Sequence, residues 1–203
     1  MIKSRILLSA VTAGMLCSVT LAEDKIGNTI IVNKDNQAEH QNGINAGWTS
    51  DGNSIKNSVI IKDGAKVDNK DKDIISGNSK DKKVNKNIVG IFGGSEVTAK
   101  YLIGGKVNIP TPTSGAMAND NNVTISGEGT KVKVNYEFMG AWVNGPGVAN
   151  DNNVTIENGA EVTSPNIYGG TSNGQSANGN RVIIDSAKVT SNIFGGDTVD
   201  SGK

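Results

Sequence analysis

The octapeptide ANDNNVTI occurs twice in this chain, at residues 118–125 and, letter for letter, at 149–156. Two interpretations of the duplicate are open. Asp and Asn oxygens are ligands that hard cations prefer, which would make the copies a duplicated metal site. The same residues also favour tight turns, and the Val-Thr-Ile that follows alternates like a half-buried strand. The rest of the chain decides between a ligand site and a repeated structural corner.

The strand-like half of the duplicate recurs along the chain. Each copy has a polar residue, usually Asn, followed by two apolar residues that flank a variable one. The first apolar residues of six such copies are Ile30, Val59, Ile88, Val123, Val154 and Val182, at intervals of 29, 29, 35, 31 and 28 residues. Repeats of this length indicate an architecture in which equivalent units stack on one another.

Two further pieces complete the repeating unit. A small-residue corner followed by valine occurs at 64–67 (GAKV), 129–132 (GTKV), 159–162 (GAEV) and 186–189 (SAKV). The third piece is an apolar residue, an apolar or aromatic residue and a small pair, as in 167–170 (IYGG), 193–196 (IFGG), 102–105 (LIGG), 138–141 (FMGA) and 44–47 (INAG). Pro165 is a one-residue insertion between the second and third pieces, and we expect a bulge there because proline donates no ladder hydrogen bond.

These patterns predict an all-β fold. Each unit offers two short strands with one apolar side, which only stacking on the next unit can bury. We therefore expect a parallel β-solenoid, as a right-handed β-helix of about six coils of 28–35 residues. A β-propeller is less suitable because its blades need about 40 residues and four strands. The charged segment 68–86 mixes Lys and Asp evenly and is predicted to be a solvated loop.

The N-terminus has the pattern of a secretory signal peptide. Lys3 and Arg5 precede the uncharged run 6–21, and cleavage is expected after Ala22. A membrane helix is the alternative, but the run is shorter than the roughly 20 strongly apolar residues that a span requires. We therefore divide the chain into a signal peptide, 1–22, and a β-helix repeat domain, 23–203. The one cysteine of the chain, Cys17, falls in the signal peptide, so the repeat domain forms no disulfide.

Composition narrows the classes of partner. The chain has 26 glycines and only 4% aromatic residues, which agrees with many turns and a small aromatic core. Without Lys3 and Arg5 the repeat domain carries 18 basic and 20 acidic side chains, a net charge near −2. No basic field is present to attract nucleic acid or an anionic membrane.

A family resemblance follows from the signal peptide and from units of the form N-x-V-x-I…G-A-x-V…N-I-Y-G-G, best matched over 152–196. The chain resembles the passenger regions of bacterial autotransporters. The resemblance implies a β-helix exported through the periplasm of a Gram-negative bacterium, displayed at the outer membrane or released, with adhesion, aggregation or host contact as its role. Such proteins normally end in a membrane β-barrel, which is missing here. We therefore expect a chain truncated at its C-terminus, or edge-to-edge self-association of its last strands.

Side-chain chemistry gives no catalytic, cofactor-binding or metal site. His40 and Arg181 are the single histidine and arginine of the repeat domain, and we expect a solvated loop residue and a surface strand residue. Glu157 and Asp185 occupy equivalent strand ends without an obvious facing partner. The Gly-Gly pairs break the Gly-Gly-x-Gly-x-Asp pattern of calcium-binding nonapeptides, since 169–173 reads GGTSN.

Trp48 and Trp142 each follow a small pair directly. Either residue could cover the corner of its own coil or stand exposed to contact sugar or protein. The function we expect is an exported, non-enzymatic adhesion or structural rod that presents the variable loops 33–56, 68–86, 106–118 and 171–179 to a surface protein or glycan of a host or neighbouring cell. The alternatives are a secreted carbohydrate-active enzyme, which would need facing carboxylates in a groove, and a non-functional fragment.

The recurring units favour the structural interpretation of ANDNNVTI. Val123 and Ile125 would point inward and Thr124 outward, because side chains alternate along a strand. Asp120 and Asp151 would make the turn, and the strand-entry Asn would stack on its equivalents in neighbouring coils through amide hydrogen bonds.

Overall fold

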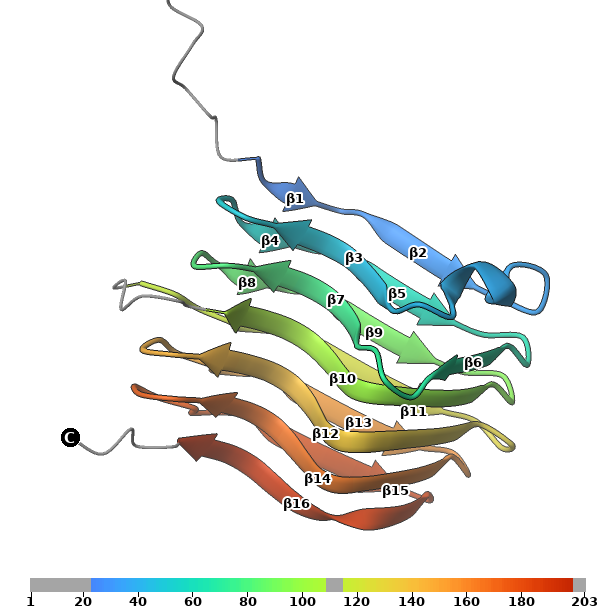
Figure 1. Ribbon diagram of the computed structural model, residues 1–203. Coiled ribbons are helices and arrows are strands. Elements are labelled where there is room, and N and C mark those ends of the chain that lie inside the picture. Colours follow the sequence, from blue (N-terminus) through green and yellow to red (C-terminus); the bar gives the residue numbers. More distant parts are fainter. Residues whose placement is uncertain (1–22, 109–114, 199–203) are drawn as a thin grey trace, which may run out of the picture.

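The computed structural model describes residues 23–108 and 115–198, and these form a parallel β-solenoid of six coils (Figure 1). The predicted fold class is confirmed. The elements are β1 (Lys25–Ile26), β2 (Thr29–Val32), the 3₁₀ helix η1 (Gln37–His40), β3 (Ile44–Thr49), β4 (Ser54–Ile55), β5 (Ser58–Ile61), β6 (Lys66–Asn69), β7 (Ile74–Ser79), β8 (Val84–Asn85), β9 (Ile88–Ile91), β10 (Glu96–Asn108), β11 (Asn122–Ser126), β12 (Lys131–Asn144), β13 (Asn153–Glu157), β14 (Glu161–Ser172), β15 (Arg181–Asp185) and β16 (Lys188–Thr198). The predicted signal peptide, 1–22, lies outside the described residues.

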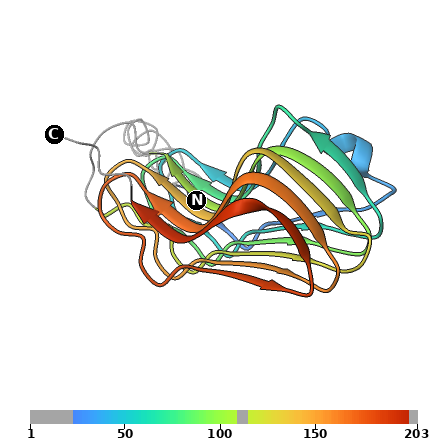
Figure 2. The ribbon, with the colours of Figure 1, turned by 90° about the horizontal axis from the view of Figure 1, so that it is seen from below.

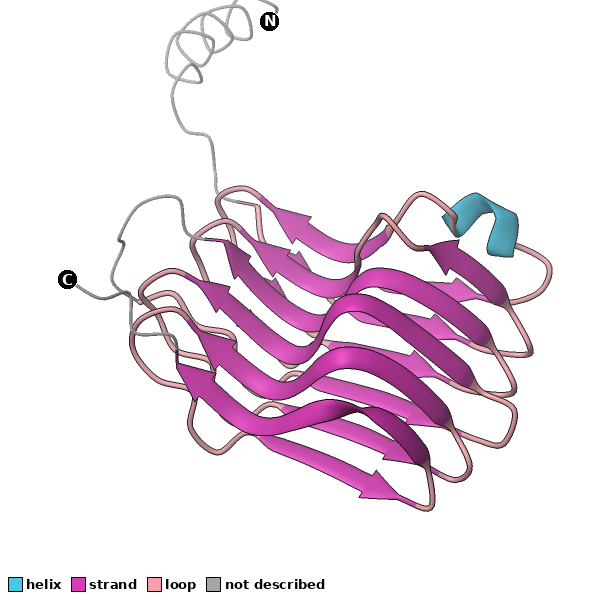
Figure 3. Cartoon of the chain, turned by 60° about the horizontal axis from the view of Figure 1, so that its bottom comes forward, coloured by secondary structure: helices cyan, strands magenta, loops and turns pink. Residues whose placement is uncertain are grey.

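Three parallel sheets form the walls of the solenoid (Figure 3). The flat sheet has the order β15-β13-β11-β9-β5-β2, and the long sheet has the order β16-β14-β12-β10-β7-β3 with β6 also paired to β10. A short sheet, β1-β4-β8, joins them along the third side. No described residue belongs to a helix long and apolar enough to cross a membrane.

The two copies of the octapeptide lie directly on each other. In the pairing of β11 with β13, Val123 is the partner of Val154 and Ile125 the partner of Ile156. All four side chains are fully buried, and Thr124 points outward as predicted. Because apolar side chains recur at the inward positions of each coil, the residues between the flat and long sheets form one continuous core.

One repeat position was predicted wrongly. The inward residue of β9 is Val89, which pairs with Val123 and Val59, whereas Ile88 lies outside with 42% of its surface exposed. Two apolar residues in succession hide which of them faces the core, and a shift of one residue reverses the faces of a strand.

The segment 68–86 was also predicted wrongly. It contains the end of β6, the whole of β7 and the two residues of β8, and Ile74 and Ile75 are buried. Most of its charged residues lie in the turns between these strands. The even mixture of Lys and Asp therefore obscured the strand pattern of β7, which belongs to the second coil. Of the other segments expected to be loops, 33–56 contains η1, β3 and β4, and 171–179 begins with the end of β14. The predicted loop 106–118 begins with the end of β10, and its residues 109–114 lie outside the described residues.

A ladder of asparagines runs through the interior at the entry to the flat sheet. It consists of Asn28, Asn57, Asn87, Asn121, Asn152 and Asn180. Each of the first five donates from Nδ2 to Oδ1 of the Asn in the next coil, over 2.9–3.1 Å. The same Oδ1 also accepts the backbone N–H of the preceding Asn. The second Nδ2 hydrogen of Asn57, Asn87, Asn121, Asn152 and Asn180 goes to a main-chain carbonyl of the preceding coil.

The ladder confirms the predicted stacking of asparagines. Asn57, Asn87, Asn121 and Asn152 are at most 1% exposed, and a buried amide is costly unless its hydrogen bonds are made. The residue before each ladder Asn has left-handed backbone, and Asp120 and Asp151 both have φ of 56°. The predicted turn role of these aspartates is therefore confirmed, since Asp tolerates this conformation better than most residues.

The small pair of the third piece is explained by the ladder. A Cβ on Gly105 would lie 2.5 Å from Cγ of Asn121, and one on Gly47 or Gly77 would collide with the amide of the ladder Asn that opens the next coil. The long sheet therefore approaches the ladder where its side chains are smallest, and Figure 2 shows its strands bending inward partway along their length. Ala141 takes this position in the fourth coil.

The strands of the long sheet are also irregular at the predicted bulge. The pairing shifts between Thr163 and Asn166, on either side of Pro165. At the first coil, the edge of β6 is covered by side chains of η1 and the residue after it. Gln41 accepts the N–H of Asp68 and donates to the carbonyl of Lys66, and Gln37 accepts the N–H of Lys66. These glutamines take the place of a neighbouring strand.

Replacing one ladder residue tests how far the fold depends on the ladder. In Asn121→Ala, the buried N–H and Nδ2 of Asn87 lose their acceptor, Oδ1 of Asn121. We expect a loss of about 3 kcal/mol in the free energy of unfolding, because each unsatisfied buried polar group costs about 1–3 kcal/mol. Urea unfolding followed by circular dichroism measures this loss.

Asn122→Ala is the matched control, because Oδ1 of Asn122 has no hydrogen-bond partner in the described structure. We expect a change within about 0.5 kcal/mol for this variant. Equal losses in the two variants would contradict a special role of the ladder.

Candidate functional site

The outer face of the long sheet carries two rows of side chains, one on either side of the small pairs. The apolar row is Asn45, Ile75, Ile103, Met139, Tyr168 and Phe194, which are register partners in successive strands. The tryptophan row is Trp48, Asn78, Lys106, Trp142, Thr171 and Asp197, which pair in the same way. Neighbouring members of a row are about 4.8 Å apart, the spacing of adjacent strands.

Two adjoining cavities lie on this face in the first three coils. The Trp48 cavity, of about 300 Å³, is lined by Trp48, Asn78, Lys80, Lys106 and Asn108. The Asp73 cavity, of about 410 Å³, has Asn42, Asn45, Asp73 and Ile75 among its walls. Asn78 and Lys106 line both cavities, which therefore form one groove. Each volume is within the range of about 300–1,000 Å³ that is usual for small-molecule sites.

The two tryptophans differ in exposure: Trp142 is covered, whereas Trp48 is open to solvent. Trp142 is half-buried and covers the surface of the protein, because its ring is stacked on Tyr101 with centroids 5.9 Å apart. Trp48 has 58% of its surface exposed, although it lies within a regular strand, β3. A large aromatic side chain held open on a rigid strand is typical of a ligand contact.

Lys106 is held in place at the junction of the cavities. Its Nζ lies 3.5 Å from a carboxylate oxygen of Asp73 and 4.6 Å from the centroid of the Trp142 ring. Only 16% of its side chain is exposed. The ammonium group is therefore ordered by an ion pair and a cation–π contact before any ligand binds.

Further aromatic side chains cover the middle and far coils of this face. Tyr101 stacks on Tyr136 at 5.4 Å, and Tyr168 stacks on Phe194 at 4.9 Å. Ile75, Ile103 and Met139 form a small cluster of their own under Tyr101, Trp142 and Tyr168, separate from the main core. The Ile-Tyr-Gly-Gly pattern was not enough to predict this cluster. Alternation after the inward Ile167 places Tyr168 outside and was the available signal.

A half-buried carboxyl group lies among these aromatic rings. Glu137 is the register partner of Tyr101 in β12. Burial raises the pKa of Glu137 above its ordinary value of 4.5, and the negative charge of Asp197 raises that pKa further. Burial also raises the pKa of Tyr101 and of Tyr168, and the charge of Glu137 adds to both shifts. The charge of Asp197, from the last strand of the sheet, thus acts on Glu137.

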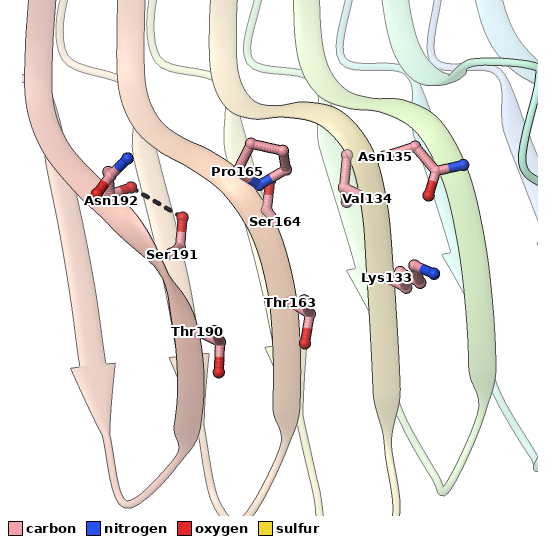
Figure 4. Close-up of a pocket in the computed structure, with 9 residues that line it drawn as sticks. All are labelled: Lys133, Val134, Asn135, Thr163, Ser164, Pro165, Thr190, Ser191 and Asn192. Atoms are coloured by element: carbon pink, nitrogen blue, oxygen red, sulfur yellow. Dashed lines mark hydrogen bonds between the residues drawn. The ribbon is translucent and has the colours of Figure 1, made fainter.

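A larger cavity lies elsewhere, at the irregular part of the long sheet (Figure 4). It has a volume of about 580 Å³ and is lined by Lys133, Val134, Asn135, Thr163, Ser164, Pro165, Thr190, Ser191 and Asn192. The hydroxyls of Ser164 and Ser191 donate to the carbonyls of Asn166 and Asn192, so they satisfy their own strands. With no aromatic side chain and one charged group, this cavity offers less chemistry than the groove.

The other residues singled out in the sequence are not in the groove. Arg181 lies exposed in β15 of the flat sheet, next to Asn153, as expected of a surface strand residue. Glu157 and Asp185 are register partners on the same sheet. His40 is the last residue of η1, and its carbonyl accepts a hydrogen bond from Asn69. This part of the chain is therefore an ordered piece of the first coil and not a free loop.

The described residues contain no group of three or more His, Cys, Asp or Glu side chains placed to hold a metal ion. In the octapeptide, the amides of Asn121 and Asn152 are used in the ladder. Comparisons with protein-family models, with curated proteins and with solved structures found no match.

The raised pKa of Glu137 predicts a pH dependence of stability. A folded-state pKa above the unfolded value gives a relative stabilisation that is complete below pH 4.5 and is lost as the pH rises through the folded-state pKa. We therefore expect Glu137→Gln to gain stability over the wild type between pH 4 and pH 7. Urea unfolding at the two pH values measures the difference. Glu128→Gln, at an exposed corner, is the control, and a pH-independent difference for Glu137→Gln would contradict the prediction.

Proposed function

We propose that this protein is an exported β-solenoid that binds a partner at the cell surface, in an adhesion or interaction role, and that its binding site is the groove of Trp48. The observation that carries the proposal is the 58% exposure of Trp48 within a regular strand, beside the ordered ammonium group of Lys106. The signal-peptide pattern of residues 1–22 and the resemblance to autotransporter passengers support export and a Gram-negative origin.

The mechanism proposed is recognition by a preorganised surface. Strands β3, β7 and β10 hold the groove residues in register through the main-chain ladder, so little order is lost on binding. Trp48 supplies apolar contact area, while Asn78 and Lys106 supply hydrogen-bond donors. The binding energy would thus be concentrated at one aromatic residue with polar groups around it, as in other hot spots.

Removing the Trp48 ring tests the proposed role. Beads coated with the purified protein would be scored for adhesion to epithelial cells and to Gram-negative bacterial cells. We expect Trp48→Ala to reduce adhesion about tenfold or more, because a central aromatic contact contributes about 2 kcal/mol.

Ile31→Ala is the matched control, since Ile31 lies in the same coil on the flat sheet and is 47% exposed. Unchanged adhesion in Trp48→Ala, with a cooperative unfolding transition like that of the wild type, would refute the role of the groove.

A second candidate function is carbohydrate-active catalysis, and the pair Glu137 and Asp197 favours it. A carboxyl group whose pKa is raised by burial and by the charge of a second carboxylate is a feature of the general acid in glycosidases. The neighbouring Tyr101 and Tyr168 would provide stacking surfaces for sugar rings.

Release of reducing ends from a panel of polysaccharides distinguishes catalysis from binding alone. If the second candidate is correct, Glu137→Gln should lower the rate at least about 100-fold, because general acid–base groups contribute about 10²–10⁴-fold. Release of reducing ends that is no greater than in a protein-free blank would dismiss it.

A further inference from the structure

The lining of the Trp48 cavity is specific enough to indicate a chemical class of ligand. We infer that the cavity takes a carboxylate-bearing saccharide, such as a uronic acid or a sialic acid residue in a glycan; this inference rests on the proposed binding function. The ligand must present an apolar face, several hydroxyl groups and a negative charge within one ring, and each of these requirements follows from a separate group of wall residues.

The first requirement comes from Trp48. An exposed indole ring offers a flat face that attracts C–H groups, and a sugar ring presents such groups on one side. A fully apolar ligand would cover the side-chain amides of Asn78 and Asn108 without offering them a hydrogen bond. The partner is therefore amphipathic, with polar groups around the rim of an apolar face.

The second requirement comes from these amides. Among the described residues, Asn78 uses its backbone N–H in a hydrogen bond to Ser54, and no bond to its side-chain amide is formed. Oδ1 of Asn108 accepts a hydrogen bond from Nδ2 of Asn144, so Nδ2 of Asn108 can still donate to a ligand. An amide both donates and accepts, and so does a hydroxyl group, so vicinal hydroxyls of a sugar match this rim.

The third requirement comes from charge. Lys80 and Lys106 are the charged residues that line the Trp48 cavity, and both are cations. Asp73 partly compensates Lys106, but its carboxylate lies in the wall of the adjoining cavity. Lys80 is exposed and takes part in none of the ion pairs formed among the described residues. A ligand carboxylate would therefore complete the charge balance of this cavity.

The groove is long enough for a ligand of more than one sugar ring. The Trp48 cavity, of about 300 Å³, is at the lower end of the range for ligand sites and suits a single sugar residue. Asn78 and Lys106 continue into the Asp73 cavity, of about 410 Å³, where Asn42 and Asn45 add further amides. A second, neutral sugar unit fits this polar extension, so we expect oligosaccharides to bind more tightly than the acidic monosaccharide.

The test compares acidic saccharides with their carboxyl-reduced forms. The probes are a galacturonic acid trimer and sialyllactose, which distinguish uronic acids from sialic acids as the source of the carboxylate. Titration calorimetry with the purified protein in 20 mM and 200 mM salt should show at least one probe binding about tenfold more tightly than its reduced form. The preference should shrink at the higher salt concentration, because exposed charge pairs are screened.

Variants separate the roles of the wall residues. Lys80→Gln should abolish the preference for the carboxylate while retaining affinity for the reduced form. Trp48→Ala should weaken binding of both forms, and Lys188→Gln, which removes an exposed lysine in the last coil, should change neither. Thermal unfolding by circular dichroism confirms that each variant is folded.

Three outcomes would overturn the inference. Equal affinity for the acidic and reduced forms would exclude a role for charge. Absence of binding at millimolar probe, with bead adhesion still dependent on Trp48, would show that the groove binds another class of partner and would leave the proposed function intact. Absence of both would reject the proposed function together with the inference.

Discussion

The asparagine ladder is the constraint on which the rest of this structure depends. A parallel stack of coils is held by main-chain hydrogen bonds, which do not by themselves choose a register. The ladder supplies that choice, because a buried amide is satisfied only when the Asn of the next coil lies directly beside it. The side chains of Asn87, Asn121 and Asn152 each have four hydrogen bonds, two at Oδ1 and two at Nδ2, so a slipped coil would leave several buried groups unpaired.

The same ladder accounts for the shape of the outer surface. The long sheet approaches the amides where its side chains are smallest, at Gly47, Gly77, Gly105, Ala141 and Gly170. Side chains on either side of these small residues then stand as two rows on the outer face. The scaffold and the candidate site are therefore linked: the residues that fit the interior also set where the rows stand outside.

Variation from coil to coil determines what the rows can do. The first three coils place Trp48, Asn78 and Lys106 in one row and leave a groove, whereas in the middle coils Tyr101 and Trp142 stack on each other and cover the surface. The bonding pattern of the ladder is unaffected by these changes, because the outward positions take no part in it. A solenoid can thus alter its binding surface while the interior pattern stays constant.

The sequence by itself determined the fold class, the stacking of the octapeptides and the turn role of Asp120 and Asp151, because these features depend on patterns that repeat along the chain. It misplaced Ile88 and the segment 68–86, where adjacent apolar residues or alternating charges hide the period. Only the tertiary structure decided that Trp48 is exposed and Trp142 is covered, and that Lys106 pairs with Asp73. Those contacts join residues of different coils, and the register that brings them together exists only once the coils are stacked.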